Sequence, residues 1–381
     1  MSIDTPHVIS KKSTSYVPKK LTDAEKMYAA SQWELMWRRF RLHKMAVIAG
    51  IVLGIMYLIA IFAPFLIPYD PWQGSEFVYS APSNVRFMHE GKFIGPFVYG
   101  VSMVMDNKTW SRTFTEDPNT IYPLRFFVNG FEYHLLGIIP GTLHLFDAGE
   151  GKVFLMGTDM MGRDLFSRVI WAFQISLSIG LVGVFVSFVL GCILGGLSGY
   201  YGGVIDMVVQ RMIEFINSIP TIPLWMALSA AVPPTWDQIQ VYMGITIILS
   251  LRGWCGLARQ VRSKLLQMRE EDFVIAAKVA GTSDWGIITR HLLPGFMSIL
   301  IVDLTLSIPG MIMGETALSF LMLGLRPPTV SWGTLMQNAQ NVSTLVAHPW
   351  EFYPALFVIV AVLAFNFLGD GLRDAADPYS L

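Results

Sequence analysis

MAVIAGIVLGIMYLIAIFAPFLI, at residues 45–67, decides the class of this protein. A helix needs roughly 20 mostly apolar residues to cross about 30 Å of hydrocarbon, and this stretch meets that length without a charge. The whole chain of 381 residues agrees, with 53% apolar and 14% charged residues and a mean hydropathy of +0.49. Soluble domains carry roughly 25% charged residues. The composition therefore predicts a polytopic membrane protein.

Five further segments have the length and composition of membrane-crossing helices. They are residues 170–197, 213–232, 239–258, 296–325 and 352–369. The residues that bear on packing or function are Gly191 and Gly195 in the second span with Gly199 just after it, Pro220 and Pro223 in the third, Arg252 in the fourth, and Asp303, Pro309 and Glu315 in the fifth. The glycine spacing predicts close helix packing. We expect an all-α membrane protein with six transmembrane helices.

Lysine and arginine gather in two segments that six spans place on the same side of the membrane. Cytoplasmic segments carry an excess of these residues near the helix ends. We therefore expect a multi-pass protein of the cell (inner) membrane with both termini in the cytoplasm. The basic residues are Lys11, Lys12, Lys19, Lys20, Lys26, Arg38, Arg39, Arg41 and Lys44 in the tail, and Arg259, Arg262, Lys264, Arg269, Lys278 and Arg290 between spans four and five.

The tail, residues 1–44, contains one further pattern. Thr22 and Glu25 form a T-x-x-E capping box, and Trp33 and Trp37 follow among basic residues. A helix that lies in the membrane interface and an ordinary positively charged flank both fit this composition.

The segment at 68–165 is too polar to cross a membrane and too long for a simple loop. Asn129-Gly130 between residues 125–128 and 131–135 is a strong hairpin signal. Glu90-Gly91 separates two short apolar runs in the same way, and residues 142–146 and 153–156 are further strand candidates. We expect a small β-rich extracytoplasmic insertion between the first two spans.

The sequence lacks the patterns of several protein classes. It contains no G-x-x-x-x-G-K-[ST], G-x-S-x-G or H-E-x-x-H motif, and no Cys/His cluster. The histidines of the insertion show no metal-ligand spacing, and Cys192 and Cys255 lie in apolar surroundings. With a formal net charge of −1, nothing points to a nucleic-acid partner. We expect no catalytic site, metal or cofactor in this chain, so energy must come from an ion gradient or a partner.

GTDMMGRDLFSR, residues 157–168, stands directly before the second span. Two acids each precede a base by four residues, which is the favourable helical order. A short self-paired helix that sets the angle of the second span is one interpretation, and contact with substrate is the other. The candidate residues are Asp159, Gly162, Arg163, Asp164 and Arg168.

Residues 270–295, EEDFVIAAKVAGTSDWGIITRHLLPG, predict two short helices bent at a glycine. Acidic residues suit the first helix N-terminus, and Thr282 or Ser283 can cap a second helix that ends before Pro294. Such a corner with small side chains fits a groove in another protein, whereas an amphipathic loop that covers only its own bundle is the alternative. The candidate residues are Asp272, Ala276, Ala277, Gly281, Trp285 and Pro294.

The pattern A-A-x-x-x-G followed by L-P in this segment resembles the EAA loop of ABC-importer permeases. Ile275 stands where that family has glutamate and His291 where isoleucine is usual, and both departures resemble the oligopeptide/dipeptide/nickel branch. Residues 157–168, 199–211, 315–324 and 327–333 resemble other motifs of that branch, and residues 37–66 resemble its N-terminal region. The chain is similar to the second type of permease subunit, with an unusually long first outer loop.

The resemblance implies a type I permease core and a larger assembly. A homologous second permease, two cytoplasmic ATPases that use ATP and Mg, and an extracytoplasmic solute-binding protein would be the partners, within the lipid bilayer. The loop at 263–295 would couple the ATPases to the five helices of residues 166–381. Glu271 or Asp272 would replace the missing glutamate.

Ionisable residues at membrane depth are candidates for the translocation pathway. Asp303 and Glu315 are separated by roughly 18 Å along one helix, so they cannot form a carboxylate pair. Glu315 either lines the pathway or ties down the following loop, and Asp303 either lines the pathway or pairs with Arg252.

The best-supported function from the sequence is a permease subunit of an ATP-driven importer for peptide-like solutes. The same machine importing oligosaccharides or other small metabolites is the alternative. A secondary transporter would predict paired intramembrane charges and an inverted repeat, and a membrane enzyme would need a nucleophile or metal set. The sequence shows none of these.

Overall fold

The computed structural model describes residues 32–105 and 112–376, so the capping box of Thr22 and Glu25 lies outside the described residues. The helical elements are α2 (Gln32–Leu42), α3 (Lys44–Leu66), α4 (Leu165–Tyr201), α5 (Gly203–Ser218), α6 (Thr221–Ala230), α7 (Gln238–Met268), α8 (Asp272–Val279), α9 (Asp284–Gly286), the π-helix η1 (Ile287–Leu292), α10 (Leu293–Gly295), α11 (Met297–Phe320), α12 (Trp332–Leu335), the 3-10 helix η2 (Met336–Gln340), α13 (Val342–Ala347), the 3-10 helix η3 (Pro349–Phe352) and α14 (Tyr353–Ala376). The strands are β1 (Arg86–His89), β2 (Lys92–Met105), β3 (Arg112–Pro123), β4 (Arg125–Leu135) and β5 (Ile139–Asp147).

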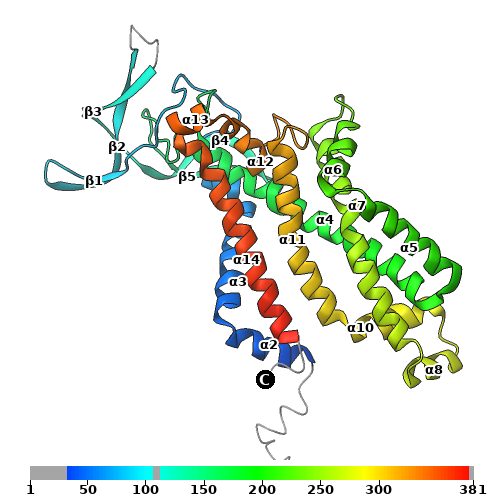
Figure 1. Cartoon of the computed structure of the whole chain (residues 1–381). Helices are drawn as coiled ribbons and strands as arrows, with labels where there is room; N and C mark the ends of the chain where they lie inside the picture. The colour runs from blue at the N-terminus through cyan, green and yellow to red at the C-terminus, as the bar shows by residue number, and fades with distance from the viewer. Residues whose placement is uncertain (1–31, 106–111, 377–381) are drawn as a thin grey trace, which may run out of the picture.

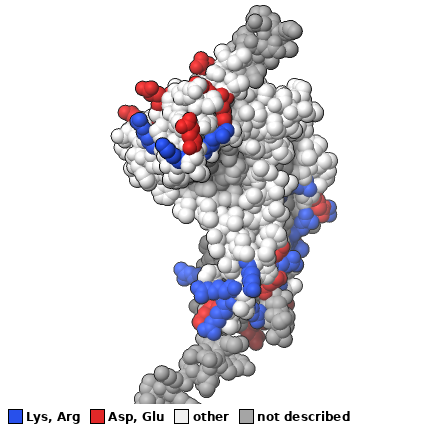
Figure 2. All heavy atoms as spheres, turned by 90° about the vertical axis from the view of Figure 1, so that its left-hand side faces the viewer, with Lys and Arg blue, Asp and Glu red and all other residues white. Residues whose placement is uncertain are grey.

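Long helices join two ends of the molecule, which we call the sheet end and the α8 end (Figure 1). The strands, α12 and α13 lie at the sheet end, whereas α2 and the last turn of α14 lie near the level of α8. On most of the face in Figure 2, an uncharged region separates charged residues at the top from those at the bottom, while along the right-hand edge charged residues extend upward from the lower group. This distribution suits a molecule whose middle is surrounded by hydrocarbon.

Five helices in the described part of the chain are long and apolar enough to cross a membrane, one fewer than the sequence predicts. They are α3, α4, α7, α11 and the segment Pro349–Ala376. The expected third span at 213–232 is instead divided between the end of α5 and α6, because Ile219 is extended before Pro220. A residue before proline disfavours the helical conformation. Together, α5 and α6 run from the α8 end to the sheet end (Figure 1).

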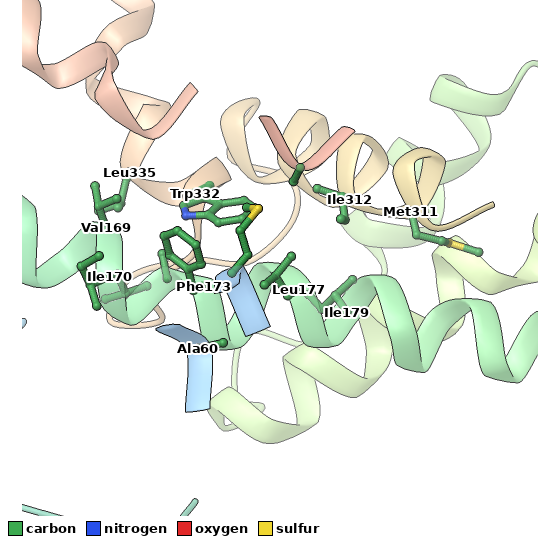
Figure 3. Packing of buried hydrophobic residues seen from close by; sticks show 14 of the residues in the cluster. Ala60, Val169, Ile170, Phe173, Leu177, Ile179, Met311, Ile312, Trp332 and Leu335 are labelled. Atoms are coloured by element: carbon green, nitrogen blue, oxygen red, sulfur yellow. The ribbon is translucent and has the colours of Figure 1, made fainter. Parts of the chain in front are cut away.

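The core is built around α4, which packs against α3, α7 and α11. A Cβ added at Gly195 would lie 2.5 Å from the carbonyl O of Ala258 in α7, and one at Gly199 would lie 2.8 Å from the carbonyl O of Arg262. The predicted close packing is therefore confirmed at the backbone level. Nearer the sheet end, the rings of Phe173 in α4 and Trp332 in α12 meet edge to face with centroids 4.9 Å apart (Figure 3).

In its described residues, the insertion holds two small antiparallel sheets, β1-β2-β3 and β4-β5. The predicted turn at Glu90-Gly91 joins β1 to β2, and both residues have positive φ, as a tight hairpin requires. The predicted turn at Asn129-Gly130 is wrong, because both residues lie within β4 where the pairing with β5 shifts register. The chain turns instead around Gly137, whose φ is +74°. Residues 142–146 lie in β5 as expected, whereas residues 153–156 form no strand.

Candidate functional site

The corner formed by α8 and α9 stands at one end of the molecule and is anchored by its inward side chains. Val274 and Ala277 of α8 and Ile287 of η1 are buried in a cluster with Tyr200 of α4 and Leu265 of α7. Glu271 stands at the N-cap position of α8, without a side-chain capping hydrogen bond, and Asp272 lies in the first turn, where the acidic run was expected. The corner therefore has a fixed position relative to α4 and α7.

Gly281 closes the corner in a left-handed conformation, with φ at +79°. The Gly281 N–H donates to the carbonyl O of Lys278, and the Thr282 N–H donates to the carbonyl O of Ala277, both at 3.0 Å. These two bonds form the Schellman pattern that ends many helices at glycine. The predicted bend at this glycine is confirmed.

The second half of the corner differs in part from the prediction. Ser283, one of the two expected caps, accepts from the Gly286 N–H and begins α9. The helical path does not end before Pro294 but continues through η1 into α10, because proline is tolerated at a first helical turn, where no N–H is needed. The Tyr200 hydroxyl donates to Asp284 Oδ1 at 2.7 Å, which ties α9 to the end of α4.

The outward side of the corner is apolar, and we call it the coupling surface. Val279 is 84% exposed, and Ala276 is exposed, whereas Ala277 points inward and cannot contact a partner. Ile275, at the position of the missing glutamate, is exposed. The large side chains of the coupling surface are Phe273, Ile275, Val279 and Trp285. An exposed apolar patch of this kind marks a contact with another molecule.

The three ionisable residues predicted in the spans do not come together. Gln260 donates to Asp303 Oδ1 at 2.8 Å, whereas the Arg252 guanidinium donates to the carbonyl O of Ile219 at 2.9 Å. The considered pairing of Arg252 with Asp303 is absent among the described residues. Arg252 instead satisfies a carbonyl freed by the break between α5 and α6.

Glu315 is fully buried near the sheet end of α11. It accepts hydrogen bonds from Ser319 Oγ at 2.8 Å and from Ser331 Oγ at 2.7 Å. Ser331 caps α12, so the carboxylate connects α11 to the loop that follows it. Glu315 was expected either to line the pathway or to tie down the following loop, and the structure shows that it binds the loop.

The motif at 157–168 is a turn rather than the expected short helix, and α4 begins only at Leu165. Gly157 and Gly162 have positive φ, which breaks a helical path. Asp159 pairs with Arg163 at 2.8 Å, as predicted, and also with Arg168 at 2.7 Å. Asp164 does not pair with Arg168. It caps α4 by accepting from the Ser167 N–H.

The same network contains an acid that sequence reasoning missed. Glu351 of η3 is buried, and neither of its carboxylate oxygens has a hydrogen-bond partner among the described residues. The neighbouring Trp350 indole donates to the carbonyl O of Thr158 at 3.0 Å. Burial also raises the pKa of Asp164 to about 7. No local pattern marks Glu351, because its environment comes from residues nearly 200 positions away.

These features define a class of protein: a multi-helix membrane component that exposes a docking corner at one end and contains no nucleotide-binding loop in its sequence. A model of the family "binding-protein-dependent transport system inner membrane component" matches residues 187–379. A model of the N-terminal TM domain of oligopeptide transport permease C matches residues 31–82.

Relatives cover nearly the whole chain. It is 33% identical to the dipeptide transport system permease protein of Lactococcus lactis subsp. cremoris, over 92% of this chain and 91% of that protein. It is 30% identical to the glutathione transport system permease protein of Pectobacterium atrosepticum, over 91% of each. The identity to the oligopeptide transport system permease protein of Haemophilus influenzae is 38%, over 60% of this chain and 71% of that protein. The chain belongs to the family of binding-protein-dependent inner-membrane permeases.

Proposed function

We propose that this chain is the second permease subunit of an ATP-driven importer that moves peptide-like solutes into the cytoplasm. The coupling surface is the observation that carries this proposal. Its apolar side chains face outward, while its inward side chains and the Tyr200–Asp284 hydrogen bond hold it on α4 and α7. A displacement of this corner therefore displaces two membrane-crossing helices, α4 and α7.

The partners follow from that arrangement. One of two cytoplasmic ATPases, which supply ATP and Mg, binds the coupling surface, and a homologous permease completes the pathway. The α8 end, where α2 and the last turn of α14 lie, faces the cytoplasm, and the insertion faces outward toward a solute-binding protein. The names of the relatives support a peptide-like cargo, since they include dipeptide, oligopeptide and glutathione permeases.

Within the pathway, we assign Asp303 to the cytoplasmic half and Arg252 to the break in the third crossing. Asp303 lines a cavity of about 500 Å³ together with Gln260 and Arg373. The cavity holds both charge signs, which suits a zwitterionic solute. Glu315 holds the outer loop in place rather than meeting the cargo.

Two exposed valines provide a matched test of the docking site. Val279 on α8 is 84% exposed and Val346 on α13 is 80% exposed, and they lie at opposite ends of the molecule (Figure 1). Val279→Asp should abolish co-purification of the ATPases and ATP-dependent uptake. Val346→Asp should leave ATPase co-purification intact. Equal ATPase recovery with both variants would refute the coupling surface.

Uptake into proteoliposomes then identifies the cargo. We expect ATP-dependent accumulation of a labelled dipeptide or tetrapeptide when the solute-binding protein is present. Accumulation of an oligosaccharide instead would still support an ATP-driven importer, but it would contradict the proposed peptide-like substrate class. Uptake driven by an ion gradient without the ATPases would contradict the proposal.

A further inference from the structure

The hairpin of β4 and β5 presents apolar side chains to its surroundings. Between residues 126 and 145, Glu132 is the single Asp, Glu, Lys or Arg. Both apolar side chains of the turn are exposed, Ile138 by 80% and Leu136 by 63%. Further exposed apolar residues on the hairpin are Phe126, Phe127, Ile139 and Leu143. A concentration of exposed apolar residues of this kind, which we call the hairpin patch, is rare on a surface that faces water.

This patch continues an exposed stripe of the first membrane-crossing helix. The stripe on α3 follows a spacing of three and four residues and consists of Ile48, Ile51, Ile55, Leu58 and Phe62. At the end of α3, the ring of Phe65 lies 6.3 Å from the ring of Phe127 in β4. The hairpin therefore begins where the lipid-facing side of α3 ends.

A cavity of about 510 Å³ lies between the hairpin turn, α3 and α4. Tyr57 and Ile61 line it from α3, Trp171 and Leu181 from α4, and Leu136 from the turn. Tyr57 stands nine residues before the end of α3, about 14 Å along the helix axis. Because a hydrocarbon core is about 30 Å thick, this part of the cavity lies within the bilayer, where no soluble partner reaches.

The turn itself is suited to the edge of a bilayer. The Gly137 N–H donates to the carbonyl O of His134 at 3.2 Å, and the Ile138 N–H donates to the carbonyl O of Leu135 at 3.1 Å. Backbone groups near hydrocarbon must be satisfied within the protein. The Trp171 indole at the cavity also matches the preference of tryptophan for the membrane interface.

We propose that the β4–β5 hairpin is a membrane-contact element at the sheet end and that the cavity holds a phospholipid acyl chain. The apolar side chains of the turn reach into the nearer leaflet, and the acyl chain fills the space between the turn and the two helices. This inference rests on the membrane-crossing assignment of α3 and α4 and is independent of the transported solute.

Site-directed spin labelling in the assembled transporter tests the hairpin position. In a background with Cys192→Ser and Cys255→Ser, a nitroxide is placed at Ile138→Cys, Ile55→Cys or Met103→Cys. Ile55 lies on the α3 stripe, and Met103 is exposed on β2. Accessibility to oxygen relative to a water-soluble nickel chelate at position 138 should match position 55 and exceed position 103 severalfold.

Two results would overturn the proposal. A ratio at position 138 equal to that at position 103 would place the hairpin in water. Protection from both reagents would show that a partner protein covers it.

Photo-crosslinking of the chain with its native cysteines tests the acyl-chain site without altering the hairpin. The probe is phosphatidylcholine with a diazirine in its acyl chain, in vesicles of unlabelled phosphatidylcholine. We expect adducts on Tyr57 and Leu136. Leu181→Trp should remove the Tyr57 adduct by filling the cavity, while adducts on the lipid-exposed Leu136 and on the α3 stripe remain. A Tyr57 adduct that persists unchanged in Leu181→Trp, or that never forms, would refute the site.

Discussion

The left-handed backbone at Gly281 allows one variant series to separate conformational strain from steric blockage. A Cβ added at this glycine meets no atom within 4 Å, so the corner itself has room for a side chain. The cost is in the backbone, because an L residue in this conformation loses about 1–2 kcal/mol, and asparagine tolerates it better than most residues. An energy of this size changes an equilibrium by a factor of about 5–30.

We therefore expect Gly281→Ala to weaken binding of the ATPase subunits by up to about 30-fold, since binding requires the formed corner. Gly281→Asn should bind more tightly than Gly281→Ala, and Gly281→Val should bind most weakly because its branched side chain suits this conformation least. The assay is titration of the ATPases onto the permease pair in nanodiscs, followed by uptake in proteoliposomes.

Gly91 provides the control for this series. It has the same φ of +79° and equally open space, but it lies in the β1–β2 turn. Gly91→Ala should leave ATPase affinity unchanged. If affinity instead falls with side-chain size, so that Gly281→Asn binds less tightly than Gly281→Ala, steric blockage explains the glycine and the strain argument is refuted.

Three further predictions address packing, the broken crossing and pH. Gly195→Ala places a Cβ 2.5 Å from a backbone oxygen of α7 and should destabilise the chain by about 1–3 kcal/mol, whereas Gly256→Ala, with open space, should not lower the Tm in detergent. Arg252→Met leaves the carbonyl of Ile219 without its donor, at a cost of about 1–3 kcal/mol, so hydrogen exchange in α6 should accelerate; unchanged exchange would contradict the clamp. Burial raises the pKa of Asp164 to about 7, so the native state binds its proton more tightly than the unfolded state, whose pKa is about 3.9. The resulting stability is complete below about pH 4 and lost as the pH rises through 7, and Asp164→Asn, which keeps a capping side chain, should flatten the Tm profile over this range.

Local sequence signals predicted the elements whose structure is decided locally. The apolar runs gave the long helices, and the sequence AAKVAG gave a helix ended by a left-handed glycine. The structure of the third crossing was harder to predict, because Pro220 divides it and neither α5 nor α6 is long enough to be recognised alone as a membrane-crossing helix. The Asn129-Gly130 signal failed because long-range packing overrode it: a Cβ added at Gly130 would lie 2.6 Å from the His144 ring.

In the candidate site too, the sequence predicted the features that are decided locally and missed those that depend on tertiary packing. Gly281 makes the predicted bend, but the sequence did not indicate that Trp285 would be exposed or that Ala277 would face inward. Arg168 pairs with Asp159 and not with Asp164, and this pairing depends on the turn at Gly162. Glu351 belongs to that network through tertiary packing, which helical spacing rules do not describe.

The length of α4 has a mechanical consequence. Its 37 residues form one continuous rod of about 55 Å. Near its first residues, Arg168 pairs with Asp159 of the preceding turn, and near its last residues Tyr200 is bonded to the coupling corner. Close-packed interiors transmit strain. A displacement of the corner therefore reaches the opposite end of the molecule through one rigid element, without passing through a hinge or a loop.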